Sequence, residues 1–214
     1  MNDAGVAARL EAVRERIAVA AKRAGRDASD VLLVAASKTI EPQRIVEAID
    51  AGQRVFGENR AQELVAHATA VGRDVDWHFL GRLQRNKVRV VARFVSCWQS
   101  VDRDELVFEI ARHAPGAPVL VQVNVGDEPQ KGGCAPADTP VLVDTARNAG
   151  LRVEGLMTVP PVAADPRPFF AQLRSLAAQL EVPQLSMGMS SDFEAAIEEG
   201  ATMIRVGTAI FGER

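Results

Sequence analysis

The sequence predicts an α/β fold, a single-domain (β/α)₈ TIM barrel, from three observations. First, amphipathic helices that end at a glycine are followed by short apolar runs, as in "EPQRIVEAIDAG" before "QRVFGEN". Second, these runs are continuously apolar, which is typical of parallel strands that are covered on both faces. Third, the 214 residues hold eight such units. An open doubly wound sheet is the alternative.

The apolar runs place the expected strands in order along the chain. They lie near residues 31–36, 53–56, 76–80, 94–98, 118–125, 152–158, 184–187 and 202–206. Helical patterns fit between most of them, and the pattern is weakest over 82–93. A first helix is expected over about 3–24. Because no Gly-, Ser- or Pro-rich linker divides the chain, we expect one domain over 1–214, with residues 1–25 preceding the barrel.

Composition excludes several classes of protein. The net charge of -3 gives no general attraction to nucleic acid or to an anionic membrane. The two cysteines, Cys97 and Cys134, form no CxxC or Cys/His ligand spacing, so no metal site is expected. The charged N-terminal segment lacks the apolar centre of a signal peptide, and no apolar run reaches the roughly 20 residues of a membrane span. We therefore expect a cytoplasmic protein.

In a barrel of this kind the active site lies at the C-terminal ends of the strands. Residues that directly follow the expected strands should therefore face one common opening. The candidate site residues chosen in this way are Lys38, Asn59, His78, Gly81, Met157, Ser190, Ser191, Arg205, Gly207 and Thr208.

Lys38 follows the first expected strand in the stretch "VLLVAASKTI". One interpretation is that its stem packs on the rim of the barrel while the ammonium reaches solvent. The other is an amine held out of water by the apolar strand end, because desolvation favours the neutral form that attacks a carbonyl carbon. The second interpretation predicts a lysine that forms a Schiff base.

The loops after the seventh and eighth strands, "SMGMSSDFEAA" and "RVGTAIFG", have the composition of an anion site. Gly188 and Gly207 allow close approach of the backbone to an anion. Ser190, Ser191 and Thr208 add hydroxyl donors, and barrels typically bind phosphate at these two loops. The alternative is that Ser191 opens a capping box, "SDFE", and only caps its helix.

A lysine opposite a phosphate site describes a pocket for an aldehyde that carries a phosphate, and pyridoxal 5′-phosphate (PLP) is such a molecule. Arg205, on the eighth strand, is placed to face the pyridine nitrogen. An arginine cannot accept a proton, so it would leave that nitrogen unprotonated and the ring a weaker electron sink. The alternative is that Arg205 pairs with a carboxylate such as Glu198 or Glu199.

The other candidates have ordinary structural explanations. Asn59 begins the helical pattern "NRAQELV" and is also explained as an N-cap. His78 is either a core histidine or a group that lines the site. Met157, Met187 and Met189 are expected to pack rather than to contact a cofactor.

Three further polar residues are expected to lie outside the site. His67 and His113 fall on predicted helices and should be on the surface. Lys131, in the loop "EPQKGG", should be exposed and charged, so it ranks below Lys38 as a Schiff-base amine.

The segments "VAASKT", "FGENRAQE", "WHFLGRLQRNK", "GLMTVPP" and "LSMGMSSDFEAAIEEGATMIRVGTAIFG" resemble the pyridoxal phosphate homeostasis proteins over nearly the whole chain. The resemblance implies a barrel of the alanine racemase N-terminal type without the second, β-rich domain. It implies PLP bound covalently, as an imine on Lys38, with phosphate contacts at Ser190, Ser191, Gly207 and Thr208. It also implies a protein, often monomeric, that has no enzymatic activity of its own and controls vitamin B6 and amino-acid balance.

Two loops depart from the pattern of that family. Arg82 stands where the family usually has proline, and "KGGC" replaces the usual lysine-serine-glycine segment near Lys131. Neither departure touches Lys38, whereas a role of the Lys131 loop is less well supported.

Three functions remain to be distinguished. The first is a PLP carrier that holds the aldehyde reversibly and passes it to PLP-dependent apoenzymes. The second is a PLP-dependent amino-acid racemase, which needs a second base opposite the lysine; alanine racemases use a tyrosine, and this chain has none. The third is an aldolase acting on a sugar phosphate, for which the strand ends offer only His78 as an acid–base residue.

Overall fold

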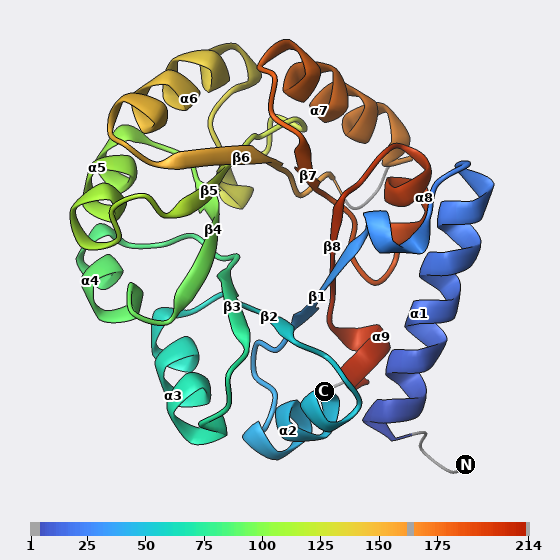
Figure 1. Ribbon diagram of the computed structural model, residues 1–214. Helices are drawn as coiled ribbons and strands as arrows, with labels where there is room; N and C mark the ends of the chain where they lie inside the picture. Colours follow the sequence, from blue (N-terminus) through green and yellow to red (C-terminus); the bar gives the residue numbers. More distant parts are fainter. Residues whose placement is uncertain (1–4, 162–164, 213–214) are drawn as a thin grey trace.

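The computed structural model describes residues 5–161 and 165–212. Within these residues, eight parallel strands close into a barrel in the order of the sequence (Figure 1). The barrel closes where β1 pairs with β8, with Val34 opposite Arg205. The predicted barrel is therefore confirmed, and the open sheet is excluded because its two edge strands would not pair.

The strands match the apolar runs of the sequence to within a few residues. Residues at their centres, such as Phe56 and Val121, are fully buried because the barrel interior covers one face and helices cover the other. The strands are β1 (Leu32–Ala36), β2 (Val55–Glu58), β3 (Asp76–Phe79), β4 (Val95–Val101), β5 (Pro118–Gln122), β6 (Arg152–Met157), β7 (Gln184–Ser186) and β8 (Met203–Val206).

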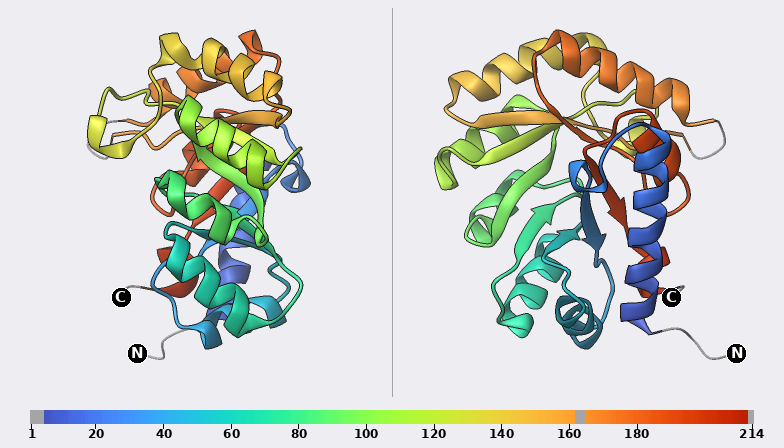
Figure 2. Two further views of the ribbon diagram at one scale, coloured as in Figure 1. Left: turned by 90° about the vertical axis from the view of Figure 1, so that its left-hand side faces the viewer. Right: turned by 45° about the vertical axis from the view of Figure 1, so that its right-hand side comes forward.

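Helices form the outer ring of the barrel (Figures 1 and 2). The α-helices are α1 (Val6–Arg23), α2 (Pro42–Asp50), α3 (Ala61–Val71), α4 (Val88–Val91), α5 (Asp104–His113), α6 (Thr139–Asn148), α7 (Arg167–Gln179), α8 (Phe193–Glu198) and α9 (Thr208–Phe211) among the described residues. Short 3₁₀ helices add η1 (Ala28–Asp30), η2 (Arg85–Lys87), η3 (Pro129–Lys131) and η4 (Pro136–Asp138). The weak pattern over 82–93 corresponds to η2 and the short α4.

The first helix, α1, precedes the barrel and packs against α2, α8 and α9. It therefore covers the outside of the barrel where β8 meets β1, as Figure 2 shows. The predicted helix over 3–24 is confirmed from Val6 to Arg23, and residues 3 and 4 lie outside the described part of the chain. None of the helices in the described residues is long and apolar enough to cross a bilayer.

The barrel interior combines an apolar cluster with polar groups. Cys97, Leu120, Met157 and Met203 pack together there. The polar side chains of Gln99, Ser186 and Arg205 are buried as well. Because buried polar groups are costly unless they are hydrogen-bonded, their partners are informative about the site.

Candidate functional site

A pocket of about 540 Å³ opens at the C-terminal ends of β1, β7 and β8. We call it the lysine pocket. The three strand ends bring together residues from both ends of the sequence because β1 and β8 are neighbours in the closed barrel. The lining residues are Ala36, Lys38, Met189, Ser190, Ser191, Arg205, Gly207 and Thr208.

Lys38 lies on this pocket with an exposed side chain. Strand β1 ends at Ala36, and residues 37–40 form a turn in which the Ile40 N–H donates to the Ser37 carbonyl at 3.0 Å. This turn carries Lys38 beyond the rim of the barrel. The prediction that the apolar strand end keeps the amine out of water is therefore wrong, because the strand stops before it reaches the lysine.

Ser191 does not cap the helix that follows it. Helix α8 begins at Phe193, its N-cap residue is Asp192, and no side chain in the described part of the chain makes a capping hydrogen bond there. Instead, Asp192 Oδ1 accepts the N–H of Met189 at 2.6 Å. The capping-box interpretation is thus wrong. Among the described residues, the hydroxyls of Ser191 and Thr208 have no hydrogen-bond partner, so both are available to a ligand.

Ser190 joins the two loops that line the pocket. Its hydroxyl oxygen accepts the backbone N–H of Gly207 at 3.2 Å and that of Ala209 at 3.4 Å. The hydroxyl proton of Ser190 is left to donate elsewhere. The backbone of Gly207 also lies close to β1, since a Cβ on this residue would stand 3.0 Å from the Ala36 carbonyl oxygen.

Gly188 serves the packing of α8 rather than the approach of an anion. Its φ is +91°, a backbone conformation that residues other than glycine rarely adopt. A Cβ at this position would lie 2.6 Å from the Cβ of Ala196 in α8. Gly188 does not line the lysine pocket. Its role is to let the chain turn sharply from β7 into the helix.

Arg205 points into the barrel below the pocket. It is 5% exposed, and its guanidinium donates to the Ser186 hydroxyl at 2.6 Å and to the Thr158 carbonyl at 2.7 Å. Burial lowers the pKa of Arg205 to about 10, and the charge of Asp192 opposes this fall. Arg205 therefore stays charged near neutral pH, and its guanidinium donates to two neutral acceptors, the Ser186 hydroxyl and the Thr158 carbonyl.

The alternative in which Arg205 pairs with Glu198 or Glu199 is wrong. Both carboxylates lie on the outside of the barrel and bind other arginines. Glu198 pairs with Arg167, and Glu199 lies 2.7 Å from Arg174.

The hydrogen bond to Ser186 begins a chain that crosses the barrel interior. The Ser186 hydroxyl donates to Gln99 Oε1 at 2.6 Å, and Gln99 Nε2 lies 2.7 Å from Nδ1 of His78. Burial lowers the pKa of His78 to about 4, so the ring is neutral and its Nδ1 accepts from the Gln99 amide. His78 is thus a core histidine that is linked to Arg205 through two residues.

Sequence reasoning missed Gln99 and Ser186. Both are polar residues inside otherwise apolar strands, in "SCWQSV" and "QLS". That signal identifies buried polar positions, but it does not show that the two strands place them within hydrogen-bonding distance.

The chain is similar to known proteins in both sequence and fold. Residues 8–214 match the family described as alanine racemase, N-terminal domain. A pyridoxal phosphate homeostasis protein of Aquifex aeolicus is 45% identical, with 96% of this chain and 97% of the relative covered. One of Pseudomonas aeruginosa is 42% identical over 98% and 96%.

This chain belongs to the pyridoxal phosphate homeostasis protein family. Among solved structures, it is similar to PipY of Synechococcus elongatus with PLP bound. The TM-score is 0.84 at 33% identity, and the match covers 97% of this chain and all of PipY.

In this family member, Asn59 and Gly81 do not line the lysine pocket. Asn59 is also not an N-cap, because α3 begins at Ala61 and Arg60 holds the N-cap position. Gly81 lies directly against Asn59, since a Cβ on Gly81 would stand 2.1 Å from the Asn59 carbonyl oxygen. Asn59 instead lines a second cavity, of about 270 Å³, at the ends of β2 and β3.

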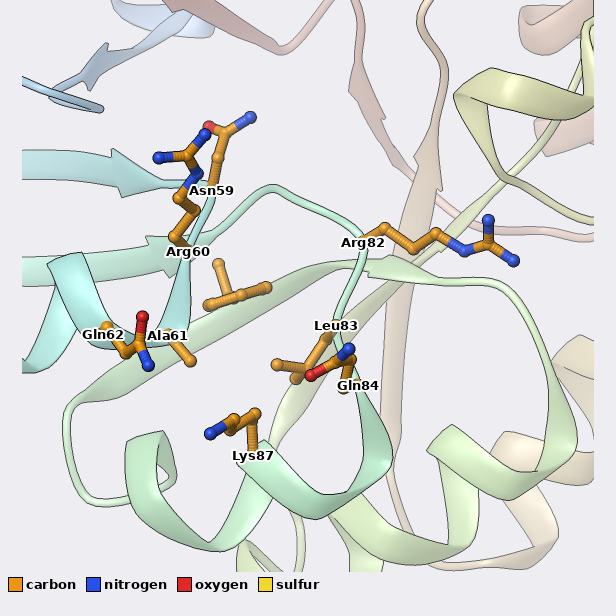
Figure 3. Close-up of a pocket in the computed structure, with 9 residues that line it drawn as sticks. Asn59, Arg60, Ala61, Gln62, Arg82, Leu83, Gln84 and Lys87 are labelled. Carbon is orange, nitrogen blue, oxygen red and sulfur yellow. The ribbon is translucent and has the colours of Figure 1, made fainter.

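Figure 3 shows this second cavity between the start of α3 and the segment that leads into η2. Among the described residues, its charged lining residues are all basic, namely Arg60, Arg82 and Lys87. They do not converge, because Arg82 points away from Lys87 in the figure and Arg60 pairs with Glu63 at 3.0 Å.

The methionines divide between packing and lining. Met157, a candidate site residue, is buried in the interior cluster and does not line the lysine pocket. Met187 is fully buried in the core, as expected. Met189 is half-buried and lines the lysine pocket, where packing alone was expected.

The remaining predicted residues lie outside the pocket. Lys131 is held by Glu128 at 2.6 Å and donates to the Pro160 carbonyl at 2.6 Å, so the expectation of an exposed amine is wrong. His67 was expected on the surface and is buried, with 7% exposure. His113 is half-buried beside Glu109. The described residues contain no group of three or more His, Cys, Asp or Glu side chains that could hold a metal.

Proposed function

We propose that this protein binds pyridoxal 5′-phosphate as a reversible imine on Lys38 and serves PLP homeostasis in the cytoplasm as a monomeric carrier. One observation carries the proposal: the exposed amine of Lys38 shares a pocket with the hydroxyls of Ser191 and Thr208, which have no partner among the described residues. An amine and a set of anion-binding donors match the two ends of a phosphorylated aldehyde. The family membership of the chain supports the same ligand.

The residues of the pocket fit distinct parts of PLP. The hydroxyls of Ser190, Ser191 and Thr208 would donate to the phosphate. Arg205 would lie toward the pyridine nitrogen and, as a donor only, would keep it unprotonated. The cavity of about 540 Å³ falls within the usual range for small-molecule sites.

The exposure of Lys38 favours exchange over retention. The neutral amine adds to the aldehyde carbon and water leaves; the reverse step needs only water, which reaches an exposed side chain. A carrier that loads and releases PLP, and passes it to apoenzymes, requires this reversibility. A racemase or decarboxylase instead protects its reactive carbon from water.

The racemase alternative lacks a second base. Among the described residues that line the pocket, only Lys38 and Arg205 have ionisable side chains, and the chain contains no tyrosine. The aldolase alternative relies on His78, which is buried below the pocket and engaged with Gln99. The racemase therefore lacks the base for proton transfer on the second face of a substrate, and the aldolase lacks an acid–base residue beside the amine.

The test is to add PLP to the purified protein and record the visible absorbance of the imine. Lys38→Ala should abolish the band, and Lys131→Ala, which removes the other loop lysine near the barrel mouth, should keep it. Borohydride reduction followed by peptide mass spectrometry locates the modified lysine. A band that survives in Lys38→Ala and disappears in Lys131→Ala would show that the assignment is wrong.

Two further assays separate the carrier from the enzyme. Incubation of the loaded protein with a PLP-dependent apoenzyme should restore activity at least as fast as an equal concentration of free PLP. Incubation with L-alanine should give no sustained formation of D-alanine. Sustained turnover would favour the racemase.

A further inference from the structure

A buried hydrogen-bonded group lies directly behind the turn that carries Lys38. The Ser37 hydroxyl donates to Oε1 of Glu58 at 2.5 Å, and Nδ1 of His67 lies 2.7 Å from the same oxygen. Ser37 and Glu58 have no exposed surface, and His67 is 7% exposed. Three elements meet at this oxygen: the end of β1, the end of β2 and helix α3.

The partner of the Glu58 carboxylate is His67. No lysine or arginine in the described residues pairs with Glu58, and His67 Nδ1 is the basic group that contacts this carboxylate among them. The hydrogen bond to Glu58 is the main cause that raises the pKa of His67, and the backbone of Ile40 adds to this rise. Glu58 Oε2 is buried without a hydrogen-bond partner among the described residues, so Oε1 carries both contacts. A buried carboxylate that loses its partner is strongly destabilised.

The turn itself is held at each residue beside Lys38. Ser37 is bound to Glu58, and Ile40 donates its N–H to the Ser37 carbonyl. Thr39 has a φ of +61°, which is unfavourable for a β-branched residue. Its N–H donates to Oε2 of Glu63 at 3.0 Å. Such a backbone conformation persists only where the surrounding structure holds it.

We propose that Glu58 and His67 are positioning residues for Lys38. The hydrogen-bonded contact between Glu58 and His67 holds Ser37, and through Ser37 it holds the turn that presents the amine to the lysine pocket. Neither residue lines that pocket, so they act through the backbone rather than by touching a ligand. This inference rests on the proposed function.

The experiment compares two ligands that differ only at the reacting atom. PLP can form an imine with Lys38. Pyridoxine 5′-phosphate carries an alcohol in place of the aldehyde and uses only the non-covalent contacts of the pocket. The variants are Ser37→Ala and His67→Gln. The control is His113→Gln, which alters a matched histidine–carboxylate pair, His113 with Glu109, on α5.

Ser37→Ala and His67→Gln should each weaken PLP binding and slow imine formation by about tenfold, the size expected for one hydrogen bond to a charged group. Their affinity for pyridoxine 5′-phosphate should change less than about twofold, because the anion donors are untouched. His113→Gln should behave as the unmodified protein with both ligands. Ser37→Ala keeps the contact between Glu58 and His67, so it carries the test if His67→Gln does not fold.

The other outcomes overturn the inference in distinguishable ways. Unchanged imine formation in both variants would show that the turn does not depend on Glu58 and His67. Equal losses for both ligands would show a general structural role instead of positioning of the amine. If the unmodified protein forms no imine at all, the proposed function fails, and this inference fails with it.

Discussion

The guanidinium of Arg205 donates to the hydroxyl of Ser186 at 2.6 Å, and this contact joins the lysine pocket to a hydrogen-bond chain inside the barrel. The chain continues through Gln99 to His78. All four side chains are buried, and the guanidinium of Arg205 also donates to the Thr158 carbonyl. Because such networks are costly when they are incomplete, the loss of one member should lower the free energy of unfolding of the protein.

Arg205→Lys tests this network. A lysine has one nitrogen and cannot reproduce the planar fork that reaches both Ser186 and Thr158. We expect the free energy of unfolding to fall by about 1–3 kcal/mol, the cost of an unsatisfied buried group. Urea denaturation measures the change. The control Arg167→Lys alters an exposed pair with Glu198 and should change stability by less than about 1 kcal/mol. Equal effects of the two variants would contradict the prediction.

Thr208→Val tests the proposed phosphate contacts. The Thr208 hydroxyl has no partner in the described residues, so its removal should leave protein stability nearly unchanged. We expect the affinity for PLP to fall about tenfold, because a hydrogen bond to a charged group is lost. Adding Ser190→Ala should weaken binding further without removing the imine. Affinity for pyridoxal, which has no phosphate, is the control and should not change. Unaltered PLP affinity in the double variant would argue against these contacts.

Because His78 is buried, we expect the folded protein to lose stability in acid. Its pKa is lowered from 6.5 to about 4 by burial, so between these values the unfolded chain binds a proton that the folded protein does not. Stability is therefore complete above about pH 6.5 and falls as the pH drops toward 4, by about 3 kcal/mol in total from this group. Urea denaturation at several pH values should show a shallower decline for His78→Asn than for the unmodified protein. Parallel curves would mean that another group is responsible.

Gly188→Ala should be much more harmful than Gly116→Ala. Both glycines have a positive φ, +91° and +73°, so both variants carry the backbone strain of about 1–2 kcal/mol. Only Gly188 has a neighbour in the way, with the Cβ of Ala196 at 2.6 Å from the added atom; no described residue lies within 4 Å of the added atom at Gly116. We expect an additional loss of about 1–3 kcal/mol for Gly188→Ala. The difference between their thermal unfolding midpoints measures it, and a difference near zero would refute this account of the β7–α8 turn.

The predictions from sequence that hold concern periodic features. The apolar runs located all the strands of the described barrel to within a few residues, because burial on both faces requires a continuous apolar sequence. Lys38, Ser190 and Thr208 were expected to share a site, and they line one pocket. That expectation followed from the geometry of barrels, in which the C-terminal ends of parallel strands meet at one rim.

The predictions that fail depend on local backbone turns. Lys38 is exposed because β1 ends two residues before it, and Ser191 does not cap α8 because the helix begins at Phe193. Helix and strand ends are decided by hydrogen bonds that sequence patterns locate only to within one or two residues. A shift of that size moves a side chain from the interior to the surface.

By itself, the sequence determined the barrel and the set of strand ends that form the lysine pocket, since both follow from apolar periodicity and chain order. Only the tertiary structure decided the partners of the buried polar groups. Arg205 binds Ser186 rather than Glu199, and His67 lies against Glu58 rather than on the surface. The physical reason is that a buried polar group takes whichever partner the packing places within about 3 Å, and residues distant in sequence provide those partners.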